Sequence, residues 1–440
     1  MTRFSVGRRR FNALLGSACA ALMQPVSAVN AIRASEESPV TTDRERLKGI
    51  AVQAAALLQQ HIASGYMSGG IALITHGDDV QVVLVGRHSR EIAGALRRNA
   101  LFRISSMTKP VTAAAAMMLI EDGKLRLDAA IDYWLPELAR RRVLKRIDSE
   151  LYDTVPARRP ITVADLLTSR LGWGIVLAPP DTYPIQKQIA ALKLVGFGAP
   201  DPASPIGPDE WLKRLGTLPL MAQPGEQWMY NTGAYVLGVL LARASGRSLP
   251  DLLHTRIFEP LGMADTGFFV TPDKRDRLVS AYRLESGTLV LYDGPANSAW
   301  ATPPAFPDGG AGLVSTADDF LAFSQLLVHR GRANGRRLLT EASITAMTTN
   351  QLSAAQRDGG AAILGRGRGW GVGMSVVVAP SDEGLPDGAY GWNGGLGTSW
   401  IADPNSRMTA LLMTQTMFTS PTPPAVHQEL WRTVFSPTVL

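Results

Sequence analysis

The fold is decided by Leu101-Phe102-Arg103-Ile104-Ser105-Ser106-Met107-Thr108-Lys109-Pro110, which leads directly into the apolar segment from Val111 to Glu121. A segment that is apolar nearly all round is typical of a helix buried on most of its faces. It ends at Asp122-Gly123-Lys124, and a glycine commonly follows the last turn of a helix. The sequence therefore predicts a buried helix that Ser106 opens and that includes Lys109.

The spacing of Ser106 and Lys109 indicates nucleophilic catalysis. Residues three apart on a helix share a face, so the lysine amine can reach the serine hydroxyl one turn earlier. A serine hydroxyl is a poor nucleophile, and a desolvated amine beside it can take its proton. A Ser-x-x-Lys tetrapeptide alone is a weak signal, but a buried lysine is rare enough to need a reason. We therefore expect both residues to be catalytic.

Other catalytic signatures are absent from the sequence. It contains no Gly-x-Ser-x-Gly motif, which argues against an α/β-hydrolase, and no His-Glu-x-x-His zinc motif. The single cysteine, Cys19, allows neither an internal disulfide nor a thiolate metal cluster. We expect a site made of oxygen and nitrogen groups, with no metal and no cofactor.

Apolar periodicity places strand signals near both ends of the chain and helices between them. We predict an α+β fold, in which residues 44–124 and 305–440 form a lobe that contains the sheet and residues 125–304 form a helical lobe. The expected helices cover residues 44–63, 165–168, 209–215, 235–244 and 424–434, and the expected strands cover 71–75, 80–85, 371–378, 388–392, 399–402 and 408–414.

The first 28 residues are interpreted as an export signal. Three arginines, Arg8 to Arg10, precede an apolar run from Ala13 to Met23 and the small-x-small pattern Val26-Ser27-Ala28. The run is shorter than the roughly 20 residues that span a bilayer. The arginines favour the twin-arginine pathway over a general secretory signal. We expect cleavage near Ala28, a linker over 29–43, and a periplasmic or secreted protein without an integral membrane segment.

The formal net charge of +6 does not indicate a nucleic-acid partner. Four arginines and no acids lie within the first 28 residues, so cleavage lowers the net charge by four units, to +2. The one basic run, residues 140–146, has acidic neighbours at Glu137, Asp148 and Glu150. A solvated helix face is the better interpretation, because nucleic-acid binding requires a concentrated basic surface.

Several further blocks, together with the Ser106 stretch, resemble the serine β-lactamase and penicillin-binding-protein superfamily. The similar branch is that of class C β-lactamases, D-alanyl-D-alanine peptidases and family VIII carboxylesterases. The resemblance covers nearly the whole mature chain and implies an antiparallel sheet flanked by helices, a helical lobe, and an active site between them. The blocks, in family order, are Asp122-Gly123-Lys124-Leu125 with Asp128, Trp134-Leu135-Pro136-Glu137-Leu138, Leu166-Leu167-Thr168-Ser169, Pro224-Gly225-Glu226-Gln227-Trp228-Met229-Tyr230, Glu259-Pro260-Leu261-Gly262-Met263 and Gly312-Leu313-Val314-Ser315-Thr316-Ala317-Asp318-Asp319.

The second motif of this family, Tyr-x-Asn, falls on Tyr230. The resemblance implies that its phenol shares the proton of Ser106 with Lys109 and passes it to the leaving group. A tyrosine, with an ordinary pKa of about 10, needs a neighbouring cation for that role. The sequence departs from the motif, because Thr232 stands third and Asn231 stands one place early. We expect both at the substrate, with the amide that grips a β-lactam side chain lost or displaced.

The third motif, Lys-Thr-Gly, corresponds to Trp392-Asn393-Gly394, where the cation is missing. The resemblance implies that Trp392 suits an uncharged or aromatic-contacting acyl substrate, and that Asn393 and Gly394 line its site. It also implies that the N–H of Gly395 and that of Ser106 form the oxyanion hole. A plain hairpin turn is the alternative for this glycine-rich run. Arg170 is the first candidate for a cation that enters the site from a loop.

These features predict a serine hydrolase that forms an acyl-enzyme on Ser106. A carboxylic-ester hydrolase of family VIII type, acting on a small-molecule ester or acyl substrate, is the leading hypothesis. A β-lactamase or D-alanyl-D-alanine carboxypeptidase is the alternative. A non-catalytic binding protein of the same fold is a third, against which the retention of Ser106, Lys109 and Tyr230 argues. The oligomeric state does not follow from the sequence.

Overall fold

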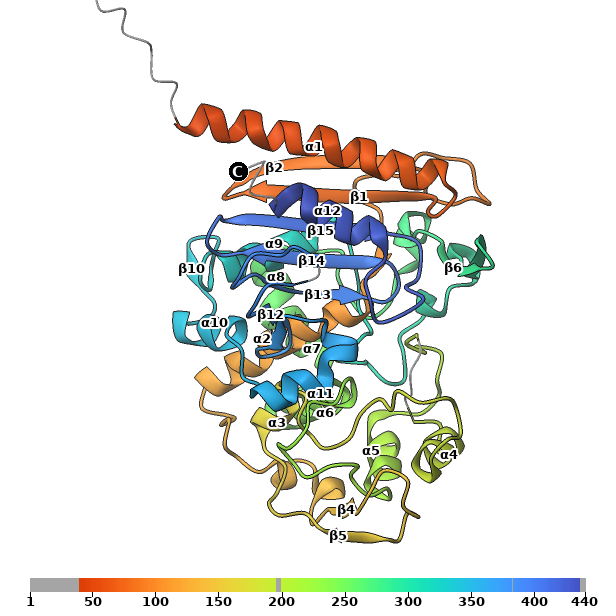
Figure 1. Cartoon of the computed structure of the whole chain (residues 1–440), viewed down its shortest axis with the longest axis vertical. Helices are drawn as coiled ribbons and strands as arrows, with labels where there is room; N and C mark the ends of the chain where they lie inside the picture. Colours follow the sequence, from red (N-terminus) through yellow and green to blue (C-terminus); the bar gives the residue numbers. More distant parts are fainter. Residues whose placement is uncertain (1–38, 195–198, 382, 436–440) are drawn as a thin grey trace, which may run out of the picture.

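The structure is a computed structural model that describes residues 39–194, 199–381 and 383–435 (Figure 1). The segment interpreted as an export signal, and residues 29–38 of the expected linker, lie outside these ranges. Within them, no helix is both long and apolar enough to cross a bilayer. Figure 1 shows a sheet with its helices in the upper part and a mainly helical part below.

A seven-stranded sheet joins the two ends of the chain. Its strand order is β11-β12-β13-β14-β15-β1-β2, and all neighbouring strands are antiparallel. The N-terminal strand β1 pairs with the C-terminal strand β15, with Ile71 opposite Met413. The expected antiparallel sheet flanked by helices is confirmed. The strands are β1 Gly69–His76, β2 Asp79–Gly86, β11 Arg368–Trp370, β12 Ser375–Val377, β13 Tyr390–Gly394, β14 Thr398–Asp403 and β15 Met408–Thr414.

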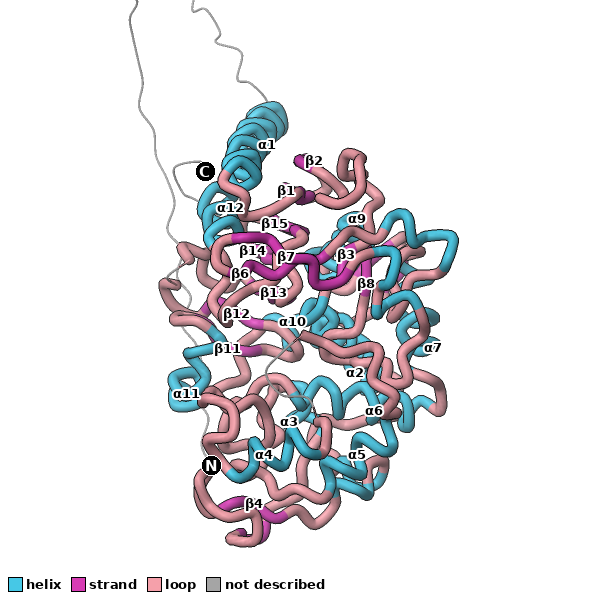
Figure 2. Tube along the Cα trace, turned by 90° about the vertical axis from the view of Figure 1, so that its right-hand side faces the viewer, coloured by secondary structure: helices cyan, strands magenta, loops and turns pink. Residues whose placement is uncertain are grey.

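The sheet separates two hydrophobic cores. Successive side chains of a strand point to opposite faces, so Ile71 and Leu73 enter one core while Ala72 and Ile74 enter the other. Helices α1 and α12 cover the second of these faces, and α2 and α9 lie on the first (Figure 2). Their bounds are α1 Pro39–Ala63, α2 Thr108–Glu121, α9 Ala317–Val328 and α12 Ala425–Phe435.

Helix α2 runs through the middle of the molecule, and its side chains from Thr108 to Leu119 are buried. It packs against α6 and α7 below the sheet. The helix ends at Glu121, and Gly123 follows with φ +72°, a conformation that the missing side chain allows. Because α2 is held on all sides, its first turn has a fixed position.

The remaining elements form the lower part and the edges of the molecule. Among the described residues, four short strand pairs accompany the helices. The helices are α3 Val163–Leu167, α4 Pro184–Ala191, α5 Pro208–Gly216, α6 Thr232–Ser245, α7 Leu249–Leu253, α8 Glu259–Leu261, α10 Glu341–Thr348 and α11 Ala354–Leu364, and the pairs are β3 Phe102–Arg103 with β8 Val314–Ser315, β4 Arg142–Leu144 with β5 Thr154–Pro156, β6 Ala281–Glu285 with β7 Thr288–Asp293, and β9 Arg332–Ala333 with β10 Arg336–Arg337.

Two expectations for the C-terminal part are wrong. Residues 371–378 were expected to form one strand, but β11 and β12 form a hairpin that turns there. Gly373 has φ +80° in this turn and lies close to the Lys109 carbonyl and the Ala113 side chain, which leaves no room for a larger residue. The second concerns helices: none was expected between residues 305 and 423, but α9, α10 and α11 lie there.

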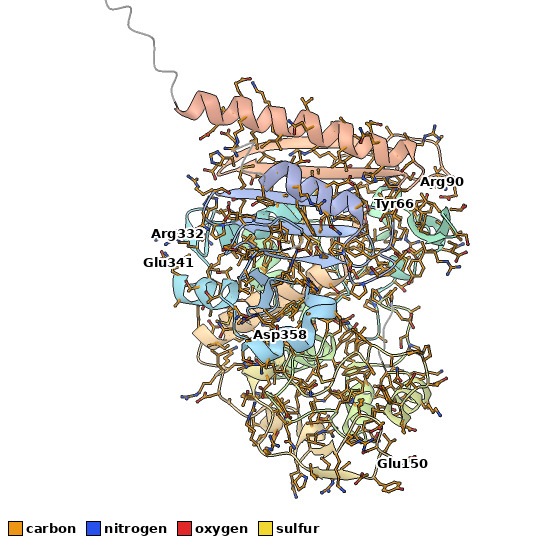
Figure 3. The ribbon with its side chains drawn as sticks, in the orientation of Figure 1. Tyr66, Arg90, Glu150, Arg332, Glu341 and Asp358 are labelled. Carbon is orange, nitrogen blue, oxygen red and sulfur yellow. The ribbon has the colours of Figure 1, made fainter. Side chains whose placement is uncertain are left out.

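The basic run at 140–146 is not a helix face. Arg142 begins β4, and Arg141 donates hydrogen bonds to the carbonyls of Gly216 and Leu218. Lys145 and Arg146 pair with the neighbouring acids Asp153 and Asp148. The exposed Glu150 lies at the lower end of the molecule, beside the β4–β5 pair (Figure 3). Two of the five basic residues of this run are therefore paired with acids, and Arg141 is held by backbone carbonyls.

Candidate active site

Ser106 lies in a short 3-10 helix of one turn, Ser105–Met107, which leads into α2. Lys109 donates a hydrogen bond of 3.0 Å to the Ser106 Oγ and one of 2.7 Å to the carbonyl oxygen of Gly310. Only 2% of Lys109 is exposed, whereas Ser106 is partly accessible. Ser105 has φ +47°, which is uncommon for a residue other than glycine. The turn thus presents a reachable hydroxyl to a buried amine.

Tyr230 approaches the same pair from the loop before α6. The Lys109 Nζ lies 4.5 Å from the centroid of its ring, within the range of a cation–π contact. The Trp392 Nε1 donates a hydrogen bond of 2.8 Å to the Tyr230 hydroxyl. The rings of Trp228 and Trp370 also lie against Tyr230, with centroids at 5.7 Å and 6.3 Å. This cluster fixes the phenol beside Lys109.

Strand β13 carries the third predicted segment to the site. Trp392, Asn393 and Gly394 are strand residues paired with β14, so the hairpin-turn alternative is wrong for them. The strand lies inside the sheet, but β12 pairs only with its first two residues, which leaves the edge at 392–394 without a strand partner. Gly394 is pressed against the carbonyl of Ile104, where a side chain would collide. This close approach places Gly395 next to the turn that contains Ser106.

A cavity of about 220 Å³ opens at Ser106. None of the described residues that line it is a lysine, an arginine or an acid. Its walls combine the Ser106 turn, Tyr230, the end of β13 and the segment 417–421. The residues that line it are Ser105, Ser106, Ile175, Ala199, Tyr230, Asn231, Ile363, Trp392, Asn393, Gly395, Leu396, Met417, Phe418, Thr419, Ser420 and Pro421.

Of the other residues predicted at the site, some line the cavity and some do not. Asn231 lines the cavity, and its Nδ2 donates a 3.0 Å hydrogen bond to the Tyr235 hydroxyl. Thr232 does not line it, because it begins α6 and only 3% of it is exposed. Gly394 does not line it either, because it packs on the Ser106 turn instead. Arg170 is also outside the cavity, since its guanidinium donates to the Thr168 hydroxyl.

Asp308 is a residue of this region that the sequence did not indicate. Its carboxylate accepts a 2.6 Å hydrogen bond from the N–H of Gly310, whose carbonyl holds Lys109. Burial raises the pKa of Asp308 to about 6, although the hydrogen bond from Gly310 and the charge of Lys109 oppose the shift. In the sequence, Asp308-Gly309-Gly310 is indistinguishable from an ordinary turn.

The geometry combines a reachable serine and a fixed phenol at one cavity with a buried lysine that is hydrogen-bonded to the serine. These are the parts that acyl transfer requires. No group of three or more His, Cys, Asp or Glu residues that could hold a metal occurs in the described ranges.

Comparisons with known proteins identify the family of this chain. Residues 54–433 match the Beta-lactamase family. The chain is 36% identical over 376 residues to Protein Rv1367c of Mycobacterium tuberculosis, covering 82% of this chain and 88% of that protein. It is 30% identical over 391 residues to Esterase EstB of Burkholderia gladioli, covering 84% of this chain and 91% of that one.

Among solved structures, EstCE1, described as a hydrolase with promiscuous acyltransferase activity, superposes with a TM-score of 0.74. The two are 26% identical, and the match covers 90% of this chain and all of EstCE1. The chain therefore belongs to the Beta-lactamase family, within the serine β-lactamase and penicillin-binding-protein superfamily.

Proposed function

We propose that this serine hydrolase is a carboxylic-ester hydrolase that acts through an acyl-enzyme on Ser106. The observation that carries the proposal is the cavity at Ser106, in which Trp392 occupies the position of the motif lysine and no described lining residue is charged. An uncharged ester suits such a cavity better than a substrate with a carboxylate. The similarity to Esterase EstB and EstCE1 supports the same substrate class.

In the proposed mechanism, the Ser106 Oγ attacks the ester carbonyl carbon, and its proton passes to the Lys109–Tyr230 pair. The N–H groups of Ser106 and Gly395 stabilise the oxyanion that forms. The bond to the alcohol oxygen then breaks, and the pair returns the proton to that oxygen. Water attacks the acyl-enzyme in the same way, which releases the acid and restores the Ser106 hydroxyl.

Trp392 has a second role in this proposal. A hydrogen bond donated to the oxygen of a phenol favours negative charge on that oxygen. The indole N–H of Trp392 makes this bond to Tyr230 at 2.8 Å. Lys109, close to the same ring, supplies the compensating positive charge. Trp392 would thus prepare Tyr230 to accept the proton.

The experiment compares short-chain nitrophenyl esters with a chromogenic cephalosporin on the purified protein. Loss of a charge-assisted hydrogen bond to a substrate carboxylate costs about 1.5–3 kcal/mol, or roughly 10- to 150-fold in binding. We expect a higher kcat/KM for the esters. A higher kcat/KM for the cephalosporin would favour the β-lactamase alternative, and turnover of neither would favour a non-catalytic relative.

We also propose that the protein acts in the periplasm or outside the cell. The support is the arrangement of the first 28 residues, with paired arginines, an apolar run and a small-x-small sequence before Val29. Small-molecule esters in that compartment would reach the cavity without crossing a membrane.

A further inference from the structure

The amine of Lys109 is buried among uncharged groups. Only 2% of the residue is exposed. In the part of the chain that the structure describes, its Nζ donates to the Ser106 hydroxyl and to the Gly310 carbonyl, and it lies over the ring of Tyr230. Burying an ammonium costs free energy unless an opposite charge lies near it. A negative group close to this centre would offset that cost.

Asp308 is an acid that reaches this centre through one peptide unit. Its carboxylate accepts a 2.6 Å hydrogen bond from the N–H of Gly310, and the Gly310 carbonyl accepts the 2.7 Å hydrogen bond from Lys109. Burial raises the pKa of Asp308 to about 6, and the charge of Lys109 opposes this rise. The two groups are therefore close enough to interact electrostatically, and at neutral pH the carboxyl is mostly ionised.

The segment that joins the two charges is held tightly in place. The Thr112 hydroxyl of α2 donates a 2.8 Å hydrogen bond to the Gly309 carbonyl. A Cβ at Gly310 would lie 3.2 Å from the Tyr235 ring and 3.3 Å from the Ala234 Cβ, both on α6. The segment thus contacts both α2 and α6, which Figure 1 shows together below the sheet. These contacts fix the separation of the carboxylate and the ammonium.

Other ionisable groups near the Asp308 carboxyl come from α6 and from neighbouring loops. Tyr235 of α6 lies beside it, and its pKa is raised first by burial and then by the charge of Asp308. Lys193 and Asp201 line the same cavity as Asp308. Tyr230, the phenol of the proton-accepting pair, lies in the loop before α6. A substitution at Asp308 leaves all four in place, so a difference from the wild type reports on Asp308.

We propose that Asp308 is a positioning residue whose carboxylate is the counter-ion of the Lys109 ammonium, and that it acts through the Gly310 peptide. The inference rests on the proposed function, in which the Lys109–Tyr230 pair takes the proton of Ser106. When the pair takes this proton, its net charge rises by one unit, and a nearby negative charge stabilises that state. Asp308 thus makes the pair a stronger base without touching the substrate.

The Asp308→Asn variant tests the charge, because it keeps the size of the side chain and an oxygen that accepts the Gly310 N–H. In the profile of kcat/KM against pH for 4-nitrophenyl acetate, the rate rises as the pair loses its proton. We expect the midpoint of this rise to move to lower pH by about one unit. A weaker base also transfers the proton more slowly, so kcat at about pH 8 should fall about tenfold.

Asp319→Asn is the matched control. Asp319 is exposed to the same 9% as Asp308, and burial raises its pKa as well. Its carboxylate also accepts a 2.8 Å hydrogen bond from a backbone N–H, that of Asp265, and it bonds to the Thr266 hydroxyl, away from the site. Its pH profile should keep the wild-type midpoint.

Asp308→Ala is the second test variant, and it removes the acceptor for the Gly310 N–H together with the charge. We expect the same movement of the midpoint and a larger fall in kcat, because the Gly310 carbonyl then loses a contact that orients it. Circular dichroism checks the fold of each variant. If Asp308→Asn does not fold, Asp308→Ala decides the question.

A second measurement separates this inference from the proposed function. The rate at which a fluorophosphonate labels Ser106 also depends on the pair, and it requires no ester turnover. Its pH midpoint should move with that of kcat/KM. Labelling without hydrolysis of any ester would overturn the proposed function alone. A midpoint that stays or rises in a folded Asp308 variant, or that moves equally in Asp319→Asn, would overturn the inference alone. No labelling at any pH would overturn both.

Discussion

At the scale of single residues, the site depends on which contacts are local in the sequence. Ser106 and Lys109 are one helical turn apart, so their hydrogen bond could be predicted from spacing alone. Asp308, which is 199 positions after Lys109 in the chain, bonds to the Gly310 that holds Lys109, and no local sequence pattern indicates this contact. Trp392 was expected at the substrate, but its hydrogen bond to Tyr230 depends on the packing of β13.

The proposed transfer of the proton through Tyr230 can be tested with single substitutions. Tyr230→Phe removes the hydroxyl that transfers the proton, so we expect kcat on 4-nitrophenyl acetate to fall about 100-fold or more. Trp392→Phe keeps an aromatic ring and removes one hydrogen bond to that hydroxyl, so kcat should fall about tenfold. Steady-state kinetics and circular dichroism measure both. A natively folded Tyr230→Phe variant with near-normal kcat would contradict the relay.

At the scale of elements, strands with alternating or fully apolar sequences were predictable, and elements defined by close backbone contact were not. The segments that became β1, β14 and β15 carry clear apolar patterns. The β11–β12 turn depends on glycines that contact α2, which a one-dimensional pattern does not reveal. Helix α9 was missed, because the expected helices included none between residues 305 and 423.

The contact between β13 and the Ser106 turn leads to a prediction with an internal control. In Gly394→Ala, the added Cβ would collide with the Ile104 carbonyl and the Thr398 hydroxyl, whereas at Gly395 nothing lies within 4 Å. We expect Gly394→Ala to lower the free energy of unfolding by about 1–3 kcal/mol and to reduce turnover. Gly395→Ala should change that free energy by less than about 0.5 kcal/mol. Equal stability of the two variants, measured by chemical denaturation, would refute this role of Gly394.

Helix α12 makes folding stability depend on pH through His427. Burial lowers the pKa of His427 to about 3, and its Nδ1 lies 2.7 Å from the Ser399 Oγ. In the unfolded chain a histidine has a pKa of about 6.5. Between these values the unfolded state binds a proton that the native state does not bind. His427 therefore does not lower the free energy of unfolding above about pH 6.5. Below that pH, protonation of the unfolded state lowers the free energy of unfolding by about 1.4 kcal/mol per pH unit.

Denaturation at several pH values between 7 and 4 measures this effect. We expect His427→Gln to flatten the dependence of the free energy of unfolding on pH, whatever its absolute stability. His254→Gln, at an exposed position, serves as the control and should keep the wild-type slope. A wild-type slope in His427→Gln would show that another group carries the acid sensitivity.

At the scale of the whole molecule, the sheet explains why a site can be assembled from distant segments. Strand β1 pairs with β15, so the two ends of the chain are held in one layer, and the segments between them pack below it around α2. The division into lobes at residues 124 and 304 stays a prediction. The resemblance of blocks in family order was more informative for this architecture than any single motif.

Export is the prediction that concerns the molecule as a whole. We expect the mature protein to begin at Val29, without Cys19, because the small-x-small sequence ends at Ala28. N-terminal sequencing of the protein from its native host, together with cell fractionation, measures this. Replacing Arg8 and Arg9 by lysine should block a twin-arginine route. Recovery of the full-length chain in the cytoplasm of wild-type cells would contradict export.

The most direct test of the central claim is the covalent labelling of Ser106. Intact-mass spectrometry after exposure to a fluorophosphonate should show a single adduct, and peptide mapping should place it on Ser106. Ser105→Ala should keep the adduct, whereas Ser106→Ala should lose it. An adduct on another residue, or none on a folded protein, would contradict the account.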